Sequence, residues 1–175
     1  MHCSFGQNKK ADQEHAFVYA LPFESEKSVL VSQAYGGYFS HKNQFSIDFK
    51  LKKGTKVLAA RSGVVVKVVD HNTKGGPHRK YLSDGNHVII RHNDGTYASY
   101  WHLNPKSAKV SKGEKVLQGQ WIACSGNTGF STMPHLHFDV YFYNEQGKSE
   151  TIPTKFQTSN GNQYLKVYRK YKKPK

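Results

Sequence analysis

Cysteine is scarce in this chain of 175 residues, which contains only Cys3 and Cys124. Two isolated cysteines are too few for a Cys-rich zinc site or a disulfide scaffold. No window is apolar over the roughly 20 residues that a membrane-spanning helix needs, and no export signal is visible. The sequence also lacks a His-Glu-x-x-His motif and a phosphate-binding loop with its lysine, which argues against helical zincin chemistry and nucleotide binding.

Acidic residues are also few, with 12 Asp and Glu against 26 Lys and Arg, so the formal net charge is +14. Two explanations fit such a charge: the protein binds a polyanionic partner, or the charge serves only to keep it soluble. Much of the excess lies in "YLKVYRKYKKPK", where basic residues alternate with tyrosines. Nucleic acid, anionic lipid and anionic cell-wall polymer would all suit this segment, and a solvated tail without a dedicated partner fits it equally well.

Patterns typical of long helices are rare, whereas aromatic residues are plentiful, with 11 Tyr and 10 Phe. Short apolar runs separated by Gly, Asn, Asp and Ser favour strands joined by turns. The length suits one domain. We therefore predict a mostly β protein with a single antiparallel sheet or sandwich-like domain and few short helices. Its expected parts are a polar N-terminal segment (1–16), the domain (17–156) and a basic Tyr/Lys-rich C-terminal tail (157–175).

The stretch "NQFSIDFKL" alternates apolar and polar residues, which is the signature of a half-buried strand. Ile47 and Phe49 share one face of this predicted strand, and Asp48 and Lys50 share the other. Since the apolar face builds the core, Asp48 is expected to point away from it.

The segment "HVIIRHNDGTYASYWHL" predicts a hairpin that turns at Asp94-Gly95, a strong short-range hairpin signal. A two-residue loop there would place Tyr100 and His102 on one face. It would also set His87 across from His102. A loop of another length would change this register.

The run "PHLHFDVYF" places two histidines one residue apart in a predicted strand. Residues i and i+2 of a strand share a face, so His135, His137 and Asp139 lie on one side while the apolar residues between them face the core. Paired imidazoles suit zinc, but an isolated His-x-His motif fits a solvated polar face as well. Asp139 is either a carboxylate that orients a ligand histidine or an ordinary solvated residue.

Polar strand faces and nearby turns together supply five candidates for a metal site. They are His41, Asp48, His102, His135 and His137. Three protein ligands and one open water position make a zinc site catalytic. Asp48 is the natural carboxylate ligand, and the chain must bend around "SHKN" to bring His41 to the same side.

At these residues the sequence resembles the lysostaphin and LytM type of zinc metallopeptidase, peptidase family M23. The motifs that carry the resemblance extend from about Leu21 to Phe156 and are "SHKNQFSIDF", "GTKVLAARSGVV", "HVIIRHNDGTYASYWHL", "GQWIACSGNTGFST" and "PHLHF". The resemblance implies a small antiparallel β fold with a substrate groove. It also implies a secreted or envelope-associated hydrolase, a zinc endopeptidase that cleaves peptide cross-links of bacterial peptidoglycan and holds one Zn²⁺ per chain.

Transferred motif by motif, the resemblance makes His41, Asp48 and His137 the metal ligands and makes His102 and His135 the catalytic pair. One departure is the spacing of the first two ligands. Many family members have His-x-x-x-Asp, whereas six residues separate His41 from Asp48 here. An exposed loop histidine is the alternative interpretation of His41.

The implied chemistry is attack by a zinc-activated water on the scissile carbonyl, assisted by two imidazoles that move a proton or stabilise the oxyanion. Tyr35 and Tyr38 could add a hydroxyl to that oxyanion site if either reaches the groove.

The alternative is a non-catalytic or latent M23-fold module that binds or regulates at the cell envelope. The five intact positions favour the enzyme. A nucleic-acid partner has only the charge and the tail in its favour, so we expect peptidoglycan peptides as the partner, with the basic tail able to bind an anionic cell-wall polymer. An extracytoplasmic location (periplasmic, secreted or envelope-associated) follows from that expected substrate.

Overall fold

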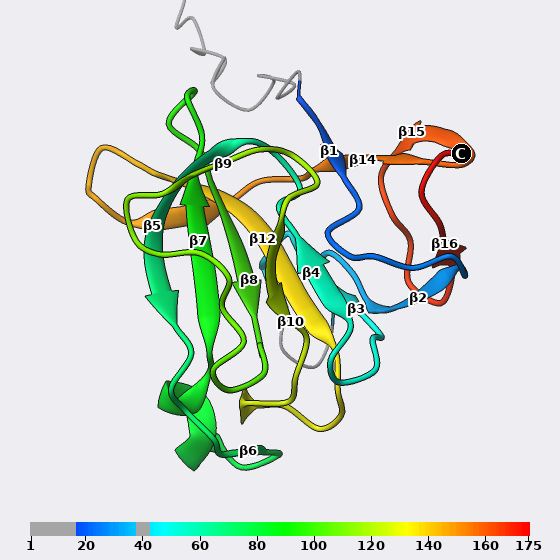
Figure 1. The fold of residues 1–175 in the computed structure, drawn as a ribbon. Helices are drawn as coiled ribbons and strands as arrows, with labels where there is room; N and C mark the ends of the chain where they lie inside the picture. Colours follow the sequence, from blue (N-terminus) through cyan, green and yellow to red (C-terminus); the bar gives the residue numbers. More distant parts are fainter. Residues whose placement is uncertain (1–16, 38–42) are drawn as a thin grey trace, which may run out of the picture.

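A nine-stranded antiparallel sheet forms the body of the protein (Figure 1). The structure is a computed structural model that describes residues 17–37 and 43–175. Eight strands of this sheet follow one another in the order β16-β2-β3-β12-β8-β7-β5-β9, and β13 pairs with β12. In that order they are Lys170–Tyr171, Val29–Gln33, Ser46–Phe49, Leu136–Tyr143, Tyr97–Trp101, His87–Arg91, Gly63–Val69 and Lys115–Val116, and β13 is Ser149–Thr151.

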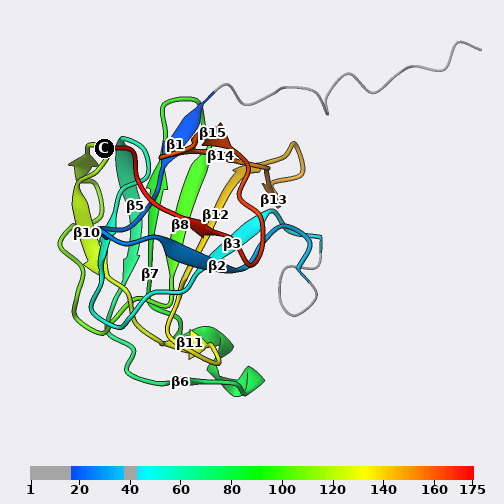
Figure 2. The ribbon, with the colours of Figure 1, turned by 90° about the vertical axis from the view of Figure 1, so that its right-hand side faces the viewer.

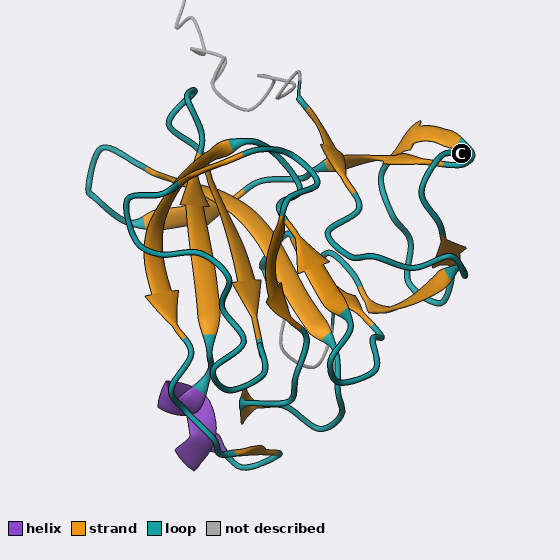
Figure 3. Ribbon diagram, viewed as in Figure 1, coloured by secondary structure: helices purple, strands orange, loops and turns teal. Residues whose placement is uncertain are grey.

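Three small sheets complete the architecture. They are β1 (Val18–Ala20) with β14 (Lys155–Thr158) and β15 (Gly161–Gln163), β4 (Lys56–Leu58) with β10 (Trp121–Cys124), and β6 (Gly75–Gly76) with β11 (Gly129–Phe130). In the described part of the chain the only helix is a single 3-10 helix, η1 (Arg79–Asp84), at one end of the large sheet (Figure 3). The predicted mostly β fold is therefore confirmed.

The hydrophobic core lies on one face of the large sheet, where the alternation along β12 places its apolar side chains. Leu136, Phe138 and Val140 are buried, and Phe138 lies in register with Ile47 on β3 and Tyr100 on β8. Strands β4 and β10 lie in front of this face in Figure 1 and contribute to the same core. Burial of a side chain such as Phe138 stabilises the fold by about 1.5–3 kcal/mol. The opposite face of β12 is left for polar residues.

The β7–β8 hairpin has a longer loop than we predict from the sequence. His92 N–H donates to the Thr96 carbonyl at 2.8 Å, which leaves three residues in the loop. Gly95 adopts φ +82° there, the left-handed conformation that such three-residue loops need. The two-residue prediction is therefore wrong, and His87 lies opposite Trp101 instead of His102.

The C-terminal residues return to the large sheet as β16, which pairs with β2 through Lys170 and Leu30 (Figure 2). Leu165 and Tyr171 are buried, at 3 % and 7 % exposure. The Tyr171 hydroxyl accepts a hydrogen bond from the Lys166 backbone N–H at 2.9 Å. The boundary after Phe156 stays a prediction. Within the described residues, no helix combines the length and the apolar character that a membrane crossing requires.

Candidate functional site

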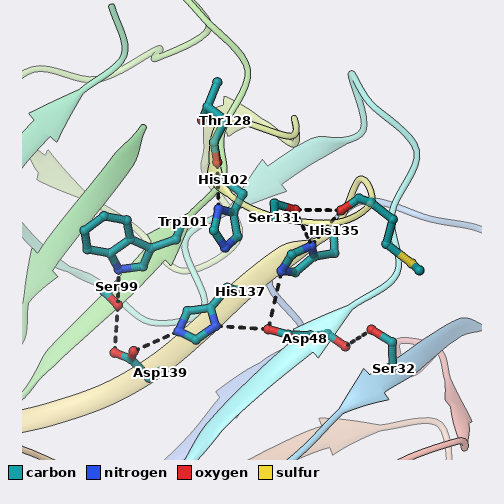
Figure 4. A network of polar contacts seen from close by, with 11 residues as sticks. Ser32, Asp48, Ser99, Trp101, His102, Thr128, Ser131, His135, His137 and Asp139 are labelled. Atoms are coloured by element: carbon teal, nitrogen blue, oxygen red, sulfur yellow. Dashed lines mark hydrogen bonds and ion pairs between the residues drawn. The ribbon is translucent and has the colours of Figure 1, made fainter. Parts of the chain in front are cut away.

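Asp48 and His137 meet on the polar face of the large sheet (Figure 4). The antiparallel register of β3 and β12 sets the two residues directly opposite each other. His137 Nδ1 lies 3.0 Å from Asp48 Oδ1, and both side chains are at most 16 % exposed. Backbone pairing therefore brings together two of the three predicted metal ligands.

His135 joins this pair from the residue just before β12. Its Nε2 lies 3.7 Å from Asp48 Oδ1. Its other ring nitrogen, Nδ1, donates to the Met133 carbonyl at 2.8 Å and lies 3.2 Å from Ser131 Oγ. These contacts hold the ring so that Nε2 faces the site.

His102 enters from the end of β8. Its ring centroid is 4.5 Å from that of His135 and 6.0 Å from that of His137. Its Nδ1 donates to the Thr128 carbonyl at 2.7 Å, and Figure 4 shows the other ring nitrogen turned toward the other two histidines. The backbone of His102 has φ +64°, a conformation that non-glycine residues rarely adopt and that clusters at functional sites.

Three side chains, linked by hydrogen bonds, orient the His137 ring at its second nitrogen, Nε2. Its Nε2 lies 3.3 Å from Asp139 Oδ2. Ser99 Oγ donates to Asp139 Oδ1 at 2.7 Å, and Trp101 Nε1 donates to Ser99 Oγ at 3.0 Å. The sequence leaves the role of Asp139 open, and the structure places its carboxylate on the second ring nitrogen of His137. Sequence analysis does not identify Ser99 and Trp101, because their link to Asp139 depends on the β8–β12 register, which sets Ser99 across from Asp139.

Tyr35 belongs to the described part of the chain, and its hydroxyl contacts backbone groups of Thr154. The Tyr35 hydroxyl donates to the Thr154 carbonyl at 2.7 Å and accepts from the Thr154 N–H at 2.8 Å. Because the hydroxyl hydrogen is donated to Thr154, it is not offered to a substrate oxyanion. Tyr38 and His41 lie outside the described residues. Within residues 17–37 and 43–175, no three His, Cys, Asp or Glu side chains form a group that could hold a metal ion.

The pKa values of His137 and His102 are shifted in opposite directions. Burial lowers the pKa of His137, but hydrogen bonds to Asp139 and Asp48 outweigh burial and raise the pKa to about 10. Burial, together with the charges of His135 and His137, lowers the pKa of His102 to about 3. Without a metal, the position between Asp48 and Asp139 therefore favours positive charge, whereas His102 is neutral at ordinary pH.

The donor pair fits a zinc ion chemically. Zinc takes imidazole nitrogen and carboxylate oxygen at about 2.0–2.2 Å, so two such donors around a tetrahedral ion lie about 3.3 Å apart. Asp48 Oδ1 and His137 Nδ1 are 3.0 Å apart. Asp139 on the opposite ring nitrogen matches the carboxylate that commonly orients a metal-binding histidine.

Comparisons with known sequences agree with this geometry. The sequence model described as Peptidase family M23 matches residues 42–149. Lysostaphin of Staphylococcus simulans is 35% identical over 118 residues, covering 67% of this chain and 22% of that protein. Glycyl-glycine endopeptidase ALE-1 of Staphylococcus capitis is 32% identical over 119 residues, covering 68% and 30%. Peptidoglycan DD-endopeptidase ShyA of Vibrio cholerae is 40% identical over 93 residues, covering 53% and 19%. The chain thus spans less than a third of each of these relatives.

Solved structures give the same picture. A point mutant of the catalytic domain of the prophage-encoded M23 protein EnpA from Enterococcus faecalis superposes with a TM-score of 0.55 at 26% identity. The match covers 74% of this chain and 92% of that one. The antimicrobial peptidase lysostaphin from Staphylococcus simulans superposes with a TM-score of 0.53 at 29% identity, covering 70% and 47%.

Proposed function

Because this chain belongs to peptidase family M23, we propose that it is a zinc-dependent endopeptidase that hydrolyses peptide cross-links of bacterial peptidoglycan. The observation that carries the proposal is the convergence of Asp48, His102, His135 and His137 on one face of the sheet. These residues come from three separate parts of the chain. The names of the relatives, two of which are peptidoglycan or glycyl-glycine endopeptidases, support the substrate class.

The proposed metal ligands are His41, Asp48 and His137. A zinc ion held there supplies a Lewis acid that polarises a carbonyl oxygen and makes water more acidic. Asp139 accepts the Nε2–H of His137, and Nδ1 would then present its lone pair to the metal beside Asp48. Ser99 and Trp101 in turn hold the Asp139 carboxylate in place.

His102 and His135 are the proposed proton-transfer residues. Each donates its Nδ1–H to a backbone carbonyl, Thr128 for His102 and Met133 for His135, and this selects the tautomer with a lone pair on Nε2. The low pKa of His102 keeps that lone pair available. The two rings can accept a proton from water and pass one to the departing amine, while a ring that has gained a proton stabilises negative charge on the substrate oxygen.

The proposed substrate also places the protein outside the cytoplasm, in the periplasm, in the cell envelope or in the medium. Its charge of +14 would favour approach to anionic wall polymers.

A combined metal and turnover measurement tests this function. Zinc is quantified by elemental analysis in the purified chain, and purified peptidoglycan is then digested with and without a chelator while released fragments are identified by mass spectrometry. We expect about one zinc per chain and chelator-sensitive release of cleaved peptides. His71→Ala is the matched control because His71 is exposed and far in sequence from the proposed ligands. It should behave like the unmodified protein.

The alternatives give different results. Bound zinc without cleavage of any peptidoglycan sample would support a latent or binding module of the cell envelope. Failure to bind zinc even after its addition would overturn the proposed site.

A further inference from the structure

A pocket of about 550 Å³ lies beside the proposed catalytic site. Its walls come from β2, from the residues that follow β3, from the loop before β12 and from β16. Figure 2 shows β16, in dark red, lying along β2, and β2 in turn pairs with β3. We call it the basic pocket, for Lys50, Lys52 and Lys170, which line it.

The basic pocket adjoins the proposed catalytic residues, because residues that line it are neighbours of His135 and Asp48 in the sequence. Met133 and Pro134 line the pocket directly before His135. The Met133 carbonyl is also the group that accepts the His135 Nδ1–H, at 2.8 Å. Lys50 follows Asp48 by two residues, so it lies about 7 Å further along the extended chain and on the same face. A peptide substrate bound at His135 would therefore extend into the basic pocket within a few residues of its own length.

The charge of the pocket is uncompensated. Lys50, Lys52 and Lys170 are all exposed, and among the described residues none of their ammonium groups makes an ion pair. No Asp or Glu is present among the described residues that line the pocket. Elsewhere, Lys56 pairs with Glu24 at 2.8 Å. Because like charges gathered in one pocket repel each other, the basic pocket favours an anionic ligand.

The third lysine is supplied by a part of the chain beyond the family match, which ends at residue 149. Lys170 is paired in register with Leu30 on β2. Its neighbour Tyr171 is only 7 % exposed and anchors the strand. The ordered strand β16 thus holds the Lys170 backbone in place, so that its charge adds to the charges that follow β3.

The floor of the pocket is apolar. Leu51 and Val29 are buried beneath it, and Met133 is 46 % exposed at its edge. Such a mixture suits a ligand with an aliphatic stem and a terminal anion, because the stem covers apolar surface while the anion meets the ammonium groups.

We propose that the basic pocket binds a free carboxylate of the peptide substrate and makes the enzyme prefer carboxylate-bearing peptides over amidated ones. This inference rests on the proposed endopeptidase function and adds a substrate class to it. Lys50 and Lys170 are the specificity-determining residues, and the Met133 side chain contacts the aliphatic stem.

The test compares two substrates and three proteins. A purified cross-linked muropeptide dimer is used with its carboxylates free and after conversion of these carboxylates to amides. The proteins are the unmodified chain, Lys50→Gln/Lys170→Gln and a control, Lys112→Gln/Lys148→Gln, which removes the same charge at exposed positions outside the pocket. Each protein is loaded with zinc, and kcat/KM is measured for both substrates.

We expect the unmodified chain and the control to prefer the free carboxylate by about tenfold, the order expected for a charge-assisted hydrogen bond. The preference should shrink as salt rises, and Lys50→Gln/Lys170→Gln should bring it close to one while zinc content stays unchanged. Equal rates on both substrates in the unmodified chain would overturn the inference, as would an equal loss on both substrates in the pocket variant.

If the unmodified chain cleaves neither substrate, the proposed function fails and binding decides the inference separately. Isothermal titration of the same two muropeptides into the zinc-loaded chain then supports the basic pocket if the carboxylate form binds more tightly and the pocket variant loses that difference. Equal binding of both forms overturns it.

Discussion

Asp48 and His137 face each other across neighbouring strands, with Asp48 Oδ1 3.0 Å from His137 Nδ1. The β3–β12 backbone pairing sets this separation, so the two donors are held in position before any metal arrives. A preorganised pair of this kind lowers the cost of ordering the side chains when a metal ion binds.

Asp48→Asn should therefore remove zinc while leaving the fold intact. The amide has nearly the same shape as the carboxylate but lacks the negative charge that favours a cation beside His137. We expect zinc affinity to fall by more than about 100-fold, beyond the range found for residues that only orient a ligand. Competition with a chromogenic chelator measures the affinity, and circular dichroism verifies the fold. Affinity equal to that of the unmodified chain would show that Asp48 is not a ligand.

Asp139→Asn tests the orienting carboxylate. Asp139 lies 3.3 Å from His137 Nε2, and its loss frees the tautomer of that ring. Zinc affinity should fall by about 10- to 100-fold. Ser99→Ala should have a smaller effect in the same direction, since Ser99 contacts Asp139 and not the ring. A larger effect from Ser99→Ala than from Asp139→Asn would contradict this order.

His102→Ala and His135→Ala should keep zinc and lose turnover by about 10²- to 10⁴-fold, the range for loss of a proton-transfer group. Zinc content by elemental analysis and peptidoglycan cleavage are measured on the same preparations. His71→Ala again serves as the control. Zinc-free His135→Ala protein would move His135 from the proton-transfer role to the metal ligands.

Burial of His92, which lies remote from the proposed metal ligands, should make the stability of the fold depend on pH. Burial lowers its pKa from 6.5 to about 4, and its Nδ1 donates to the Ser62 carbonyl at 2.9 Å. Between these two pH values the unfolded chain binds the proton and the folded chain does not. The contribution of His92 is therefore complete above about pH 6.5 and is lost as pH falls toward about 4, by up to about 3 kcal/mol.

Urea unfolding at pH 7 and pH 4 measures this change for the unmodified chain and for His92→Gln, both with chelator so that metal loss does not contribute. The free energy of unfolding of the unmodified chain should fall more steeply toward pH 4. Parallel losses in the two proteins would exclude His92 as the source.

Tyr171→Ala tests whether β16 stabilises the domain. Tyr171 is 7 % exposed and its hydroxyl accepts a hydrogen bond from the Lys166 N–H, so the substitution should cost about 2–4 kcal/mol in urea unfolding. Tyr168→Ala is the matched control, because Tyr168 is 76 % exposed and should change the free energy of unfolding by less than about 0.5 kcal/mol. Equal effects of the two substitutions would mean that β16 adds little stability.

The sequence by itself determines which side chains share a face, because the side-chain period of a strand is two and the buried face must be apolar. The alternation in "PHLHFDVYF" separates His135, His137 and Asp139 from the buried Leu136 and Phe138, as the structure confirms. The motifs likewise suffice to identify the family. The role of His41 stays a prediction because the residue lies outside the described part of the chain.

Register and long-range pairing were decided only by the tertiary structure. The pairing of β8 with β12 brings Ser99 beside Asp139. Separately, the β7–β8 loop is one residue longer than predicted and sets His87 opposite Trp101. Local sequence does not resolve it because Asp94-Gly95 suits both loop lengths. In the same way, "YLKVYRKYKKPK" carries no sign that Lys170 pairs with Leu30, since the partner strand lies far away in the sequence and the pairing depends on burial of Tyr171.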